Sequence, residues 1–231
     1  MRKIDPEGVW SDFESQLHDQ LQYFQHSWEA LDDAANRKIA TENYALTIGV
    51  MFEGYINDLI FAYANRDCSQ VVQHLENSVR ECLAGTRKAQ TAFDKFGEFN
   101  QRSHLTKAEL KEILDPDGRN TSFPDYAAIE DRAQQWLAPA HRGRFENLGQ
   151  QERAVINATI SVRNNLAHRS KGSLDRLNQV FEAGALHPTG LRRNVNRIQQ
   201  AGHYLKARVN GEARVVILAR LLRNASDALV H

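Results

Sequence analysis

The chain has 231 residues, of which 42% are hydrophobic and 25% are charged, as in an ordinary globular protein rather than a disordered or fibrous one. Its 29 basic and 29 acidic residues balance, but residues 151–231 hold 13 Lys and Arg against 5 Asp and Glu, whereas residues 1–150 hold 16 against 24. A chain of this length can form one large domain with a sizeable core. The charge imbalance indicates either an anionic partner for the basic part or attraction between the two parts.

Neither secretion nor a membrane span is expected. The first residues, MRKIDPEGVW, lack the apolar segment of a secretory signal. The most apolar stretch, residues 44–64, is interrupted by polar residues such as Glu53 and Asp58, whereas a span needs about 20 mostly apolar residues. Cys68 and Cys82 would lie roughly 21 Å apart along one predicted helix, too far for a disulfide. We therefore expect reduced thiols in a cytoplasmic protein.

Regular apolar spacing predicts three helices in the first part of the chain. Asp5-Pro6-Glu7 is typical of a helix start, because an acidic cap precedes a proline in the first turn. A second helix is predicted over residues 39–64, and a third over residues 69–83, where Gly85 ends or loosens it. Steps of three and four residues predict that one face of the first helix is core: Trp10, Phe13, Leu17, Leu21, Phe24, Trp28 and Leu31.

Two shorter helices are predicted in the middle of the chain. Thr106 and Glu109 have the spacing of a capping box, in which each side chain bonds the other residue's backbone, and they open a helix over residues 107–114. Another helix is predicted over residues 125–137, stopped by Pro139.

The segment DPDGRNTSFPDY lies between these helices and begins like a calcium-binding loop. Such a loop needs glycine at its sixth position and a bidentate acid at its twelfth, where this sequence has Asn120 and Tyr126. We therefore expect a plain turn, and no metal site anywhere in the chain.

The last part of the chain is also predicted to be helical, which makes the fold class all-α. Ser173 is the predicted cap of one of these helices. Asn210-Gly211 either separates two helices or forms the turn of a tight hairpin; the apolar spacing after it favours a helix. Helices are expected over residues 148–169, 174–181, 191–209 and 212–229, with a loop at 184–190.

The segment SVRNNLAHRS, at the end of the helix over residues 148–169, gathers side chains suited to phosphate chemistry. Arginine offers a forked cation that grips phosphate oxygens. Histidine titrates near pH 6.5 and can move protons at physiological pH. Each helical residue turns about 100°, so Asn164 and His168 lie near one face, whereas Arg163 and His168 are roughly 140° apart. Together these residues suit phosphodiester cleavage.

Arg163-Asn164-Asn165-Leu166-Ala167-His168 resembles the R-N-x-x-x-H signature of the HEPN superfamily, all-helical domains that are often metal-independent ribonucleases. The segment FEGYINDLI resembles an earlier helix of that superfamily, in which an acid lies within an apolar run. The resemblance covers the helices of roughly residues 39–168. It implies a HEPN-type helical bundle in a single domain, residues 1–231, with an insertion at 85–149 and a helical extension at 173–231.

The resemblance also implies site residues and partners. Arg163 and His168 would be catalytic, with Asn164 and Arg169 binding or orienting the substrate, and with neither a metal nor another cofactor. Glu53 would orient the motif from a neighbouring helix, or it is merely an exposed or capping polar residue. Two motifs would face each other across the cleft of a homodimer, so that Arg163 of one chain works beside His168 of the other.

Three hypotheses for function remain open. In the first, the chain is a metal-independent endoribonuclease: the RNA 2′-OH attacks the adjacent phosphate, His168 is the general base or acid, and Arg163 stabilises the phosphorane. The resemblance implies a prokaryotic toxin or antiviral-defence effector that acts on RNA and has an antitoxin or defence-system protein as partner. In the second, a non-catalytic helical module binds RNA or a protein. In the third, Arg163 and His168 merely interact favourably with a helix dipole. Ser170 stands where one branch of toxins has a tyrosine that accepts a nucleotidyl group, which argues against that regulation.

Overall fold

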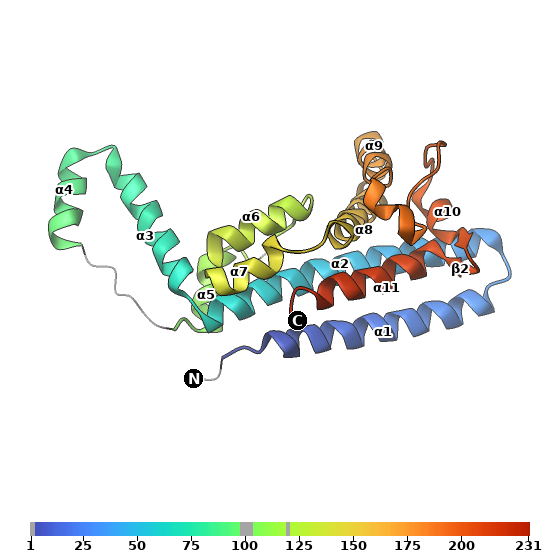
Figure 1. The fold of residues 1–231 in the computed structure, drawn as a ribbon, viewed down its shortest axis with the longest axis horizontal. Coiled ribbons are helices and arrows are strands. Elements are labelled where there is room, and N and C mark those ends of the chain that lie inside the picture. The colour runs from blue at the N-terminus through green and yellow to red at the C-terminus, as the bar shows by residue number, and fades with distance from the viewer. Residues whose placement is uncertain (1–2, 98–103, 119–120) are drawn as a thin grey trace.

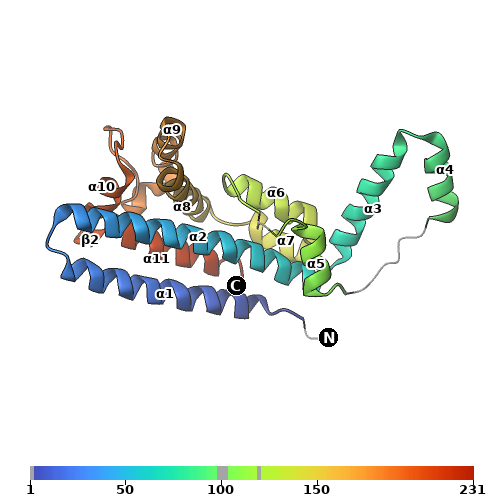
Figure 2. The ribbon, with the colours of Figure 1, turned by 180° about the vertical axis from the view of Figure 1, so that it is seen from behind.

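Three long helices run side by side along the molecule (Figures 1 and 2). They are α1 (Pro6–Ala30), α2 (Ala34–Arg66) and α11 (Arg214–Asp227). One of them, α2, contributes more buried apolar residues than any other element. A fourth long helix, α8 (Gln150–His168), crosses α2 and α11 and is seen nearly end-on in Figure 1. The computed structural model describes residues 3–97, 104–118 and 121–231. Regular structure within these residues is helical apart from one hairpin of two-residue strands, so the fold is all-α, as the sequence predicts.

Aromatic side chains join α1 to α2. The rings of Phe13 and Tyr55 stack with their centroids 4.5 Å apart, and those of Phe24 and Tyr44 stack at 4.6 Å. All four rings are buried. Of the apolar stripe predicted for the first helix, Trp10, Phe13, Leu17 and Phe24 are confirmed as core, whereas Leu21, Trp28 and Leu31 are half-buried. The helix α2 begins earlier than predicted because the Asp33 carboxylate caps its first turn.

By length and composition alone, α2 is apolar enough to cross a membrane, but one such helix is weak evidence for a membrane span. Of its most apolar 18-residue window, 61% is buried inside the fold. The core helix of a globular protein passes the same test, because it too must be apolar. In this fold α2 is the core helix, packed against α1, α8, α10 and α11.

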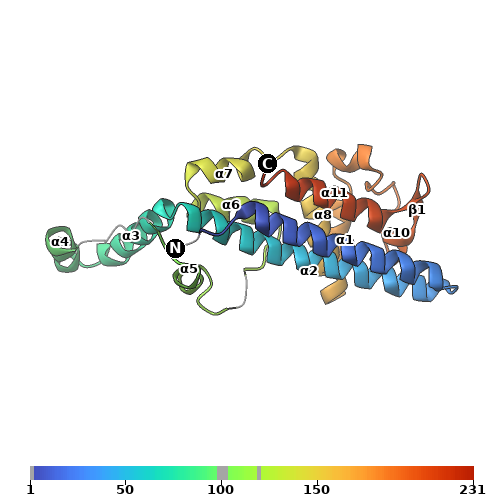
Figure 3. The ribbon, with the colours of Figure 1, turned by 90° about the horizontal axis from the view of Figure 1, so that it is seen from below.

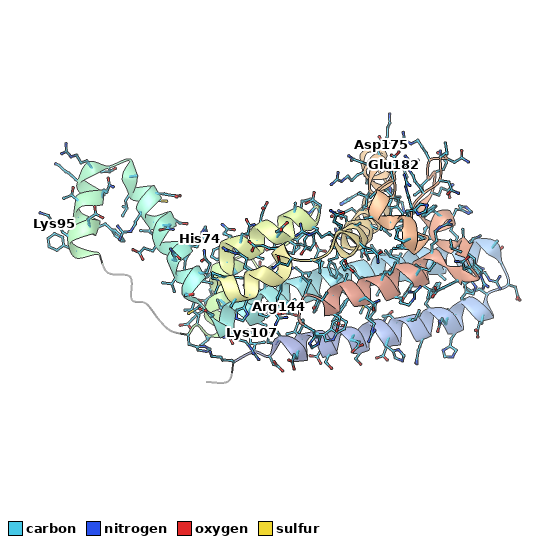
Figure 4. The ribbon with its side chains drawn as sticks, in the orientation of Figure 1. His74, Lys95, Lys107, Arg144, Asp175 and Glu182 are labelled. Carbon is cyan, nitrogen blue, oxygen red and sulfur yellow. The ribbon has the colours of Figure 1, made fainter. Side chains whose placement is uncertain are left out.

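The helices α3 (Ser69–Ala84) and α4 (Arg87–Phe96) form a hairpin that extends away from one end of the molecule (Figures 1 and 3). Val71 is the one buried residue that these two helices contribute. Near the base of the hairpin, the ring of His74, labelled in Figure 4, meets the ring of Trp136 edge-on at 4.5 Å. The sequence predicts α3 but not α4, which has no buried face to signal it.

The two cysteines lie at either end of α3. Cys68 is buried just before the helix and Cys82 is exposed near its end, and these two described residues form no disulfide, as their spacing predicts. Burial raises the pKa of the Cys68 thiol above its ordinary value.

Three short helices cover the second half of α2: α5 (Lys107–Leu114), α6 (Tyr126–Trp136) and α7 (Pro139–Glu146). The capping box predicted before α5 is present, with both of its reciprocal hydrogen bonds. The helix α6 ends before Pro139, as predicted. Pro139 also occupies the first turn of α7, a helix that was not predicted, where its missing N–H costs nothing. These helices and α4 lie in residues 85–149, the segment predicted to be an insertion, of which residues 98–103 and 119–120 lie outside the described part.

The chain after α8 differs most from prediction. The helix α9 (Lys171–Val180) begins earlier than expected, because Ser170 rather than Ser173 is its cap. The predicted loop at 184–190 contains a 3-10 helix, η1 (Gly184–Thr189). The helix expected over residues 191–209 is wrong: residues 191–200 have no regular structure, and only α10 (Ala201–Lys206) is helical.

A tight hairpin precedes α11, so both structures considered for this segment are present. The strands β1 (Arg208–Val209) and β2 (Glu212–Ala213) pair antiparallel. Asn210 and Gly211 form the turn with φ of 51° and 87°, the left-handed values that an Asn-Gly hairpin turn requires. The last helix therefore starts at Arg214, two residues after the predicted position.

Candidate functional site

The segment SVRNNLAHRS occupies the end of α8 and the turn that follows it. Arg169 ends the helix in a left-handed conformation with φ of 47°. Ser170 then caps α9 by accepting a hydrogen bond from the backbone of Ser173, whose hydroxyl accepts one in return. The chain thus turns sharply from α8 into α9, and His168, the last helical residue, is exposed beside the turn.

The Arg163 guanidinium is held in place by two neighbours. Its Nη2 lies 2.9 Å from Oε2 of Glu53 on α2, and its Nη1 donates to the Asn164 amide oxygen at 2.9 Å. The Arg163 and Glu53 side chains are 26% and 20% exposed, so water screens this ion pair only partly. The buried Nε has no hydrogen-bond acceptor among the described residues. Arg163 is therefore oriented by the helix that the sequence analysis singled out.

Arg163, Asn164 and His168 line one groove of about 550 Å³. Its opposite wall is the segment Ser122–Asp125, which leads into α6, and α9 contributes Arg176. These elements meet beside the point where α8 crosses α2 (Figure 1). All three motif residues therefore border the same groove.

Hydrogen bonds fix the opposite wall. The Asn57 amide on α2 bonds both the N–H and the C=O of Thr121, at 3.1 and 2.9 Å. At the other end, Asp125 caps α6 and accepts a hydrogen bond from Arg176 at 3.2 Å. The Asn157 side chain accepts from the N–H of the residue after Asp125 at 2.7 Å. The groove is thus bounded by backbone that is anchored to α2 and α8.

The predicted site residues fall into two places. Arg163, Asn164 and His168 lie together in the groove, and Glu53 lies behind them in contact with Arg163. Arg169 does not line the groove; it points towards α2, where it pairs with Glu42 at 3.3 Å and is 75% exposed. A role for Arg169 in substrate binding therefore has no contact in this structure to support it.

Sequence reasoning missed the other residues of the groove. Arg176 carries no motif, and it reaches the groove only because α9 folds back against α8. The wall residue Phe123 is buried within a turn-rich segment, and its apolar character was the one available signal. Gly49 was also missed: a Cβ built at this position would lie 2.6 Å from Cβ of Arg163. Only a residue without a side chain lets α2 approach Arg163 so closely.

The groove combines two arginines with an exposed histidine. Two guanidinium groups, those of Arg163 and Arg176, face it, and each is paired with one carboxylate that limits its freedom. An exposed imidazole at its rim can donate or accept a proton. Within residues 3–97, 104–118 and 121–231, no cluster of three or more His, Cys, Asp or Glu side chains has the arrangement of a metal site.

In comparisons with known proteins, no family model matches the chain, and neither a curated protein nor a solved structure does. The candidate site is therefore defined by its own residues: the Glu53–Arg163 ion pair, the neighbouring Asn164 and the exposed His168 on one wall of the groove.

Proposed function

We propose that the chain is an endoribonuclease whose active site is the groove lined by Arg163, Asn164 and His168. The observation that carries the proposal is the position of Arg163, held by Glu53 and Asn164 in the same groove as an exposed histidine. A held cation and a titratable base are what cleavage of a phosphodiester next to a 2′-OH requires. The resemblance of residues 163–168 to the HEPN signature supports the same chemistry.

In the proposed reaction, the RNA 2′-oxygen forms a bond to the adjacent phosphorus as the bond from phosphorus to the 5′-oxygen breaks. His168 either takes the proton of the 2′-OH, in which case a solvent water protonates the departing 5′-oxygen, or gives its own proton to the 5′-oxygen, in which case a solvent water takes that of the 2′-OH. Arg163 stabilises the negative charge of the phosphorane, and Asn164 orients Arg163. The products are a 2′,3′-cyclic phosphate and a free 5′-OH, and no metal ion takes part.

The proposal includes a homodimer, in which Arg163 of one protomer acts beside His168 of the other. Arg163 is mostly buried against Glu53, whereas His168 is exposed and open to a second chain. Light scattering should give about twice the 26.3 kDa of one chain. A strict monomer at micromolar concentration would rule out the shared site.

The role proposed for such an enzyme is that of an effector, either a toxin or part of antiviral defence. Its partner would be a cognate antitoxin or a defence-system protein.

The test is cleavage of labelled single-stranded RNA in EDTA, followed by analysis of the product ends. His168→Ala should abolish cleavage and leave RNA binding nearly unchanged, since one exposed side chain rarely affects the fold. The matched control is His203→Ala, another exposed histidine, on α10, which should cut at the wild-type rate. RNA with a 2′-deoxy sugar at the scissile position should resist cleavage. The proposal fails if His168→Ala cuts as fast as the wild type, or if cleavage needs added magnesium.

One observation speaks against a catalytic role for Arg163, and so for a second candidate function, a non-catalytic module that binds RNA through other residues. Both Nη atoms of Arg163 already bond protein oxygens, from Glu53 and Asn164, which leaves fewer donors for a phosphate. This candidate predicts that wild type and His168→Ala bind RNA equally and that neither cuts it.

A further inference from the structure

A second basic pocket lies beyond the C-terminal end of α9, at the opposite end of that helix from the sharp turn at Ser170. It is formed by the irregular segment of residues 191–200, here named the arginine loop, together with η1 and the hairpin before α11. The pocket has a volume of about 750 Å³. Arg192, Arg193, Arg214 and His187 line it, with Glu182 as its one carboxylate.

The arginine loop is irregular but firmly anchored. The Asn178 side chain on α9 is buried, and its amide bonds both the N–H and the C=O of Ile198, at 2.8 and 2.9 Å. Towards the start of the loop, the N–H of Arg193 donates to the C=O of Phe181 at 2.7 Å. Because both ends are bonded to the region of α9, the loop holds its arginines in fixed positions without being helical.

Two of the three pocket arginines are positioned by the fold. Arg214 lies over the ring of Tyr204, with its guanidinium carbon 4.5 Å from the ring centroid, and its Nε donates to the C=O of Gly190 at 3.2 Å. Arg193 is 12% exposed and pairs with Glu182 at 2.6 Å. Such fixed side chains lose little entropy when an anion binds.

Arg192, in contrast, keeps most of its donors available. Its Nε bonds the C=O of Glu182 at 3.1 Å, and within the described part of the chain it forms no ion pair. Three guanidinium groups thus face one carboxylate, which itself already pairs with Arg193. This excess of positive charge, with planar donors at its edge, is suited to phosphate oxygens.

The pocket is linked to the groove along α9. The arginine loop runs antiparallel to this helix: Asp175 binds Arg197, and Glu182, just after the helix, binds Arg193. Arg176, next to Asp175, reaches the groove. Asp175 and Glu182 are labelled in Figure 4. A helix of 10 residues is about 15 Å long, a distance that a short single strand can span.

We infer that this pocket, between the arginine loop and Arg214, binds a backbone phosphate of the RNA strand whose scissile bond lies in the groove. That the bound strand is the RNA cut in the groove rests on the proposed function. That the pocket binds a phosphate does not. Contacts with phosphates bind RNA of any sequence and weaken with salt. The pocket would therefore supply affinity, whereas the groove supplies the reaction.

The test is titration of a labelled single-stranded RNA of about 12 nucleotides. Its riboses carry 2′-O-methyl groups, so that it cannot be cut during the measurement. Arg192→Glu should weaken binding about tenfold, and the slope of log affinity against log salt should fall by about 0.7 for each lost phosphate contact. Arg192→Lys should recover part of the affinity. The matched control is Arg87→Glu, the same change at an exposed arginine on the distant α4, which should alter affinity less than about twofold.

The outcomes separate this inference from the proposed function. Loss of RNA affinity in Arg192→Glu supports the pocket even if the wild type cuts no RNA, in which case only the nuclease proposal fails. RNA cleavage that depends on His168, with unchanged RNA affinity in Arg192→Glu, overturns the pocket alone. A mononucleotide 5′-phosphate is the other source of such a group. If it binds as tightly as the RNA, and equally needs Arg192, the pocket serves a free nucleotide and the strand assignment is overturned.

Discussion

Gly49 of α2 lies directly against the side chain of Arg163, so closely that a Cβ at position 49 would be 2.6 Å from Cβ of the arginine. The helix that carries Glu53 can therefore approach α8 only because residue 49 has no side chain. The position of the proposed catalytic arginine depends on this absence as much as on its ion pair with Glu53.

Gly49→Ala should displace Arg163 and lower cleavage. Alanine favours a helix over glycine by about 0.5–1 kcal/mol. Overpacking at a tight contact costs about 1–3 kcal/mol, so the net free energy of unfolding should fall. The matched control is Gly54→Ala on the same helix, where an added Cβ meets nothing within 4 Å. Chemical denaturation should show Gly54→Ala more stable than the wild type and Gly49→Ala less stable. A Gly49→Ala protein with wild-type stability and cleavage would contradict the packing argument.

Glu53→Gln should separate binding from cleavage. The neutral amide leaves Arg163 without its counter-charge, so the affinity for RNA phosphates should rise a few-fold while the cleavage rate at saturating RNA falls, because Arg163 loses its orientation. Loss of this partly buried ion pair should cost about 1–2 kcal/mol of unfolding free energy. Asp58→Asn removes the same charge from an exposed position of α2 and serves as control. Equal losses of binding and cleavage in Glu53→Gln would show that Glu53 does not act by orienting Arg163.

Asn178→Ala should release the arginine loop. The substitution removes both hydrogen bonds to Ile198 in a buried site, which should cost about 2–3 kcal/mol. Hydrogen exchange should show faster exchange of the Ile198 amide, with little change in α1 and α2. Asn194→Ala, at an exposed position of the same loop, should remain within about 0.5 kcal/mol of the wild type. Unchanged protection of Ile198 in Asn178→Ala would show that other contacts hold the loop.

Alkaline pH should destabilise the fold partly through Tyr63. Burial raises the pKa of its hydroxyl from 10.0 to about 12, and the hydroxyl donates to the C=O of Leu229 at 2.7 Å. Between these values the unfolded chain loses the proton first, so stability present below pH 10 is lost as the pH rises towards 12. The loss should be about 1.4 kcal/mol per pH unit.

Tyr63→Phe tests this contribution by denaturation at several pH values. The variant should lose about 1 kcal/mol at neutral pH, for the missing hydrogen bond, and should show a shallower decline between pH 10 and 12. Tyr23→Phe, at a ring that is 72% exposed, should change neither quantity. If the free energy of unfolding falls equally steeply with pH in Tyr63→Phe and in the wild type, the alkaline loss comes from other buried tyrosines.

Elements that depend on local apolar spacing were predicted better than elements that depend on contacts between distant segments. The start of α1 and its buried face were predicted, because a proline follows an acidic cap and a single apolar face that packs on α2 repeats at helical spacing. The short helix α7 was missed because its Pro139 serves both as the end of one helix and as the start of the next. Local spacing cannot distinguish these roles.

Residues 191–209 show why apolar spacing can mislead. Leu191, Ile198 and Leu205 are buried and seven residues apart, which fits a helix, yet Val195 between them is 96% exposed. The chain reaches its buried positions by an irregular path that Asn178 stabilises from another helix. A contact between distant segments of this kind leaves no local pattern.

The candidate site divides in the same way. Arg163, Asn164 and His168 were predicted because one short motif contains all three. Gly49 and Arg176 could not be predicted from the sequence, because their roles arise only where α2 and α9 pack against α8.

Two hydrogen bonds join α2 to the C-terminal part of the chain, which is far away in sequence. Tyr55 and Tyr63 donate to the C=O groups of Ser226 and Leu229, across 171 and 166 residues of chain. During synthesis α2 is made long before these two acceptor residues. Until they are made, α1 is the long helix against which the apolar surface of α2 can pack. Contacts between such distant residues slow folding, because the loop must close before they can form. We therefore expect α1 and α2 to associate first and α11 to pack against them late. Until then the apolar surface of α2 stays partly exposed, and a chaperone could bind it.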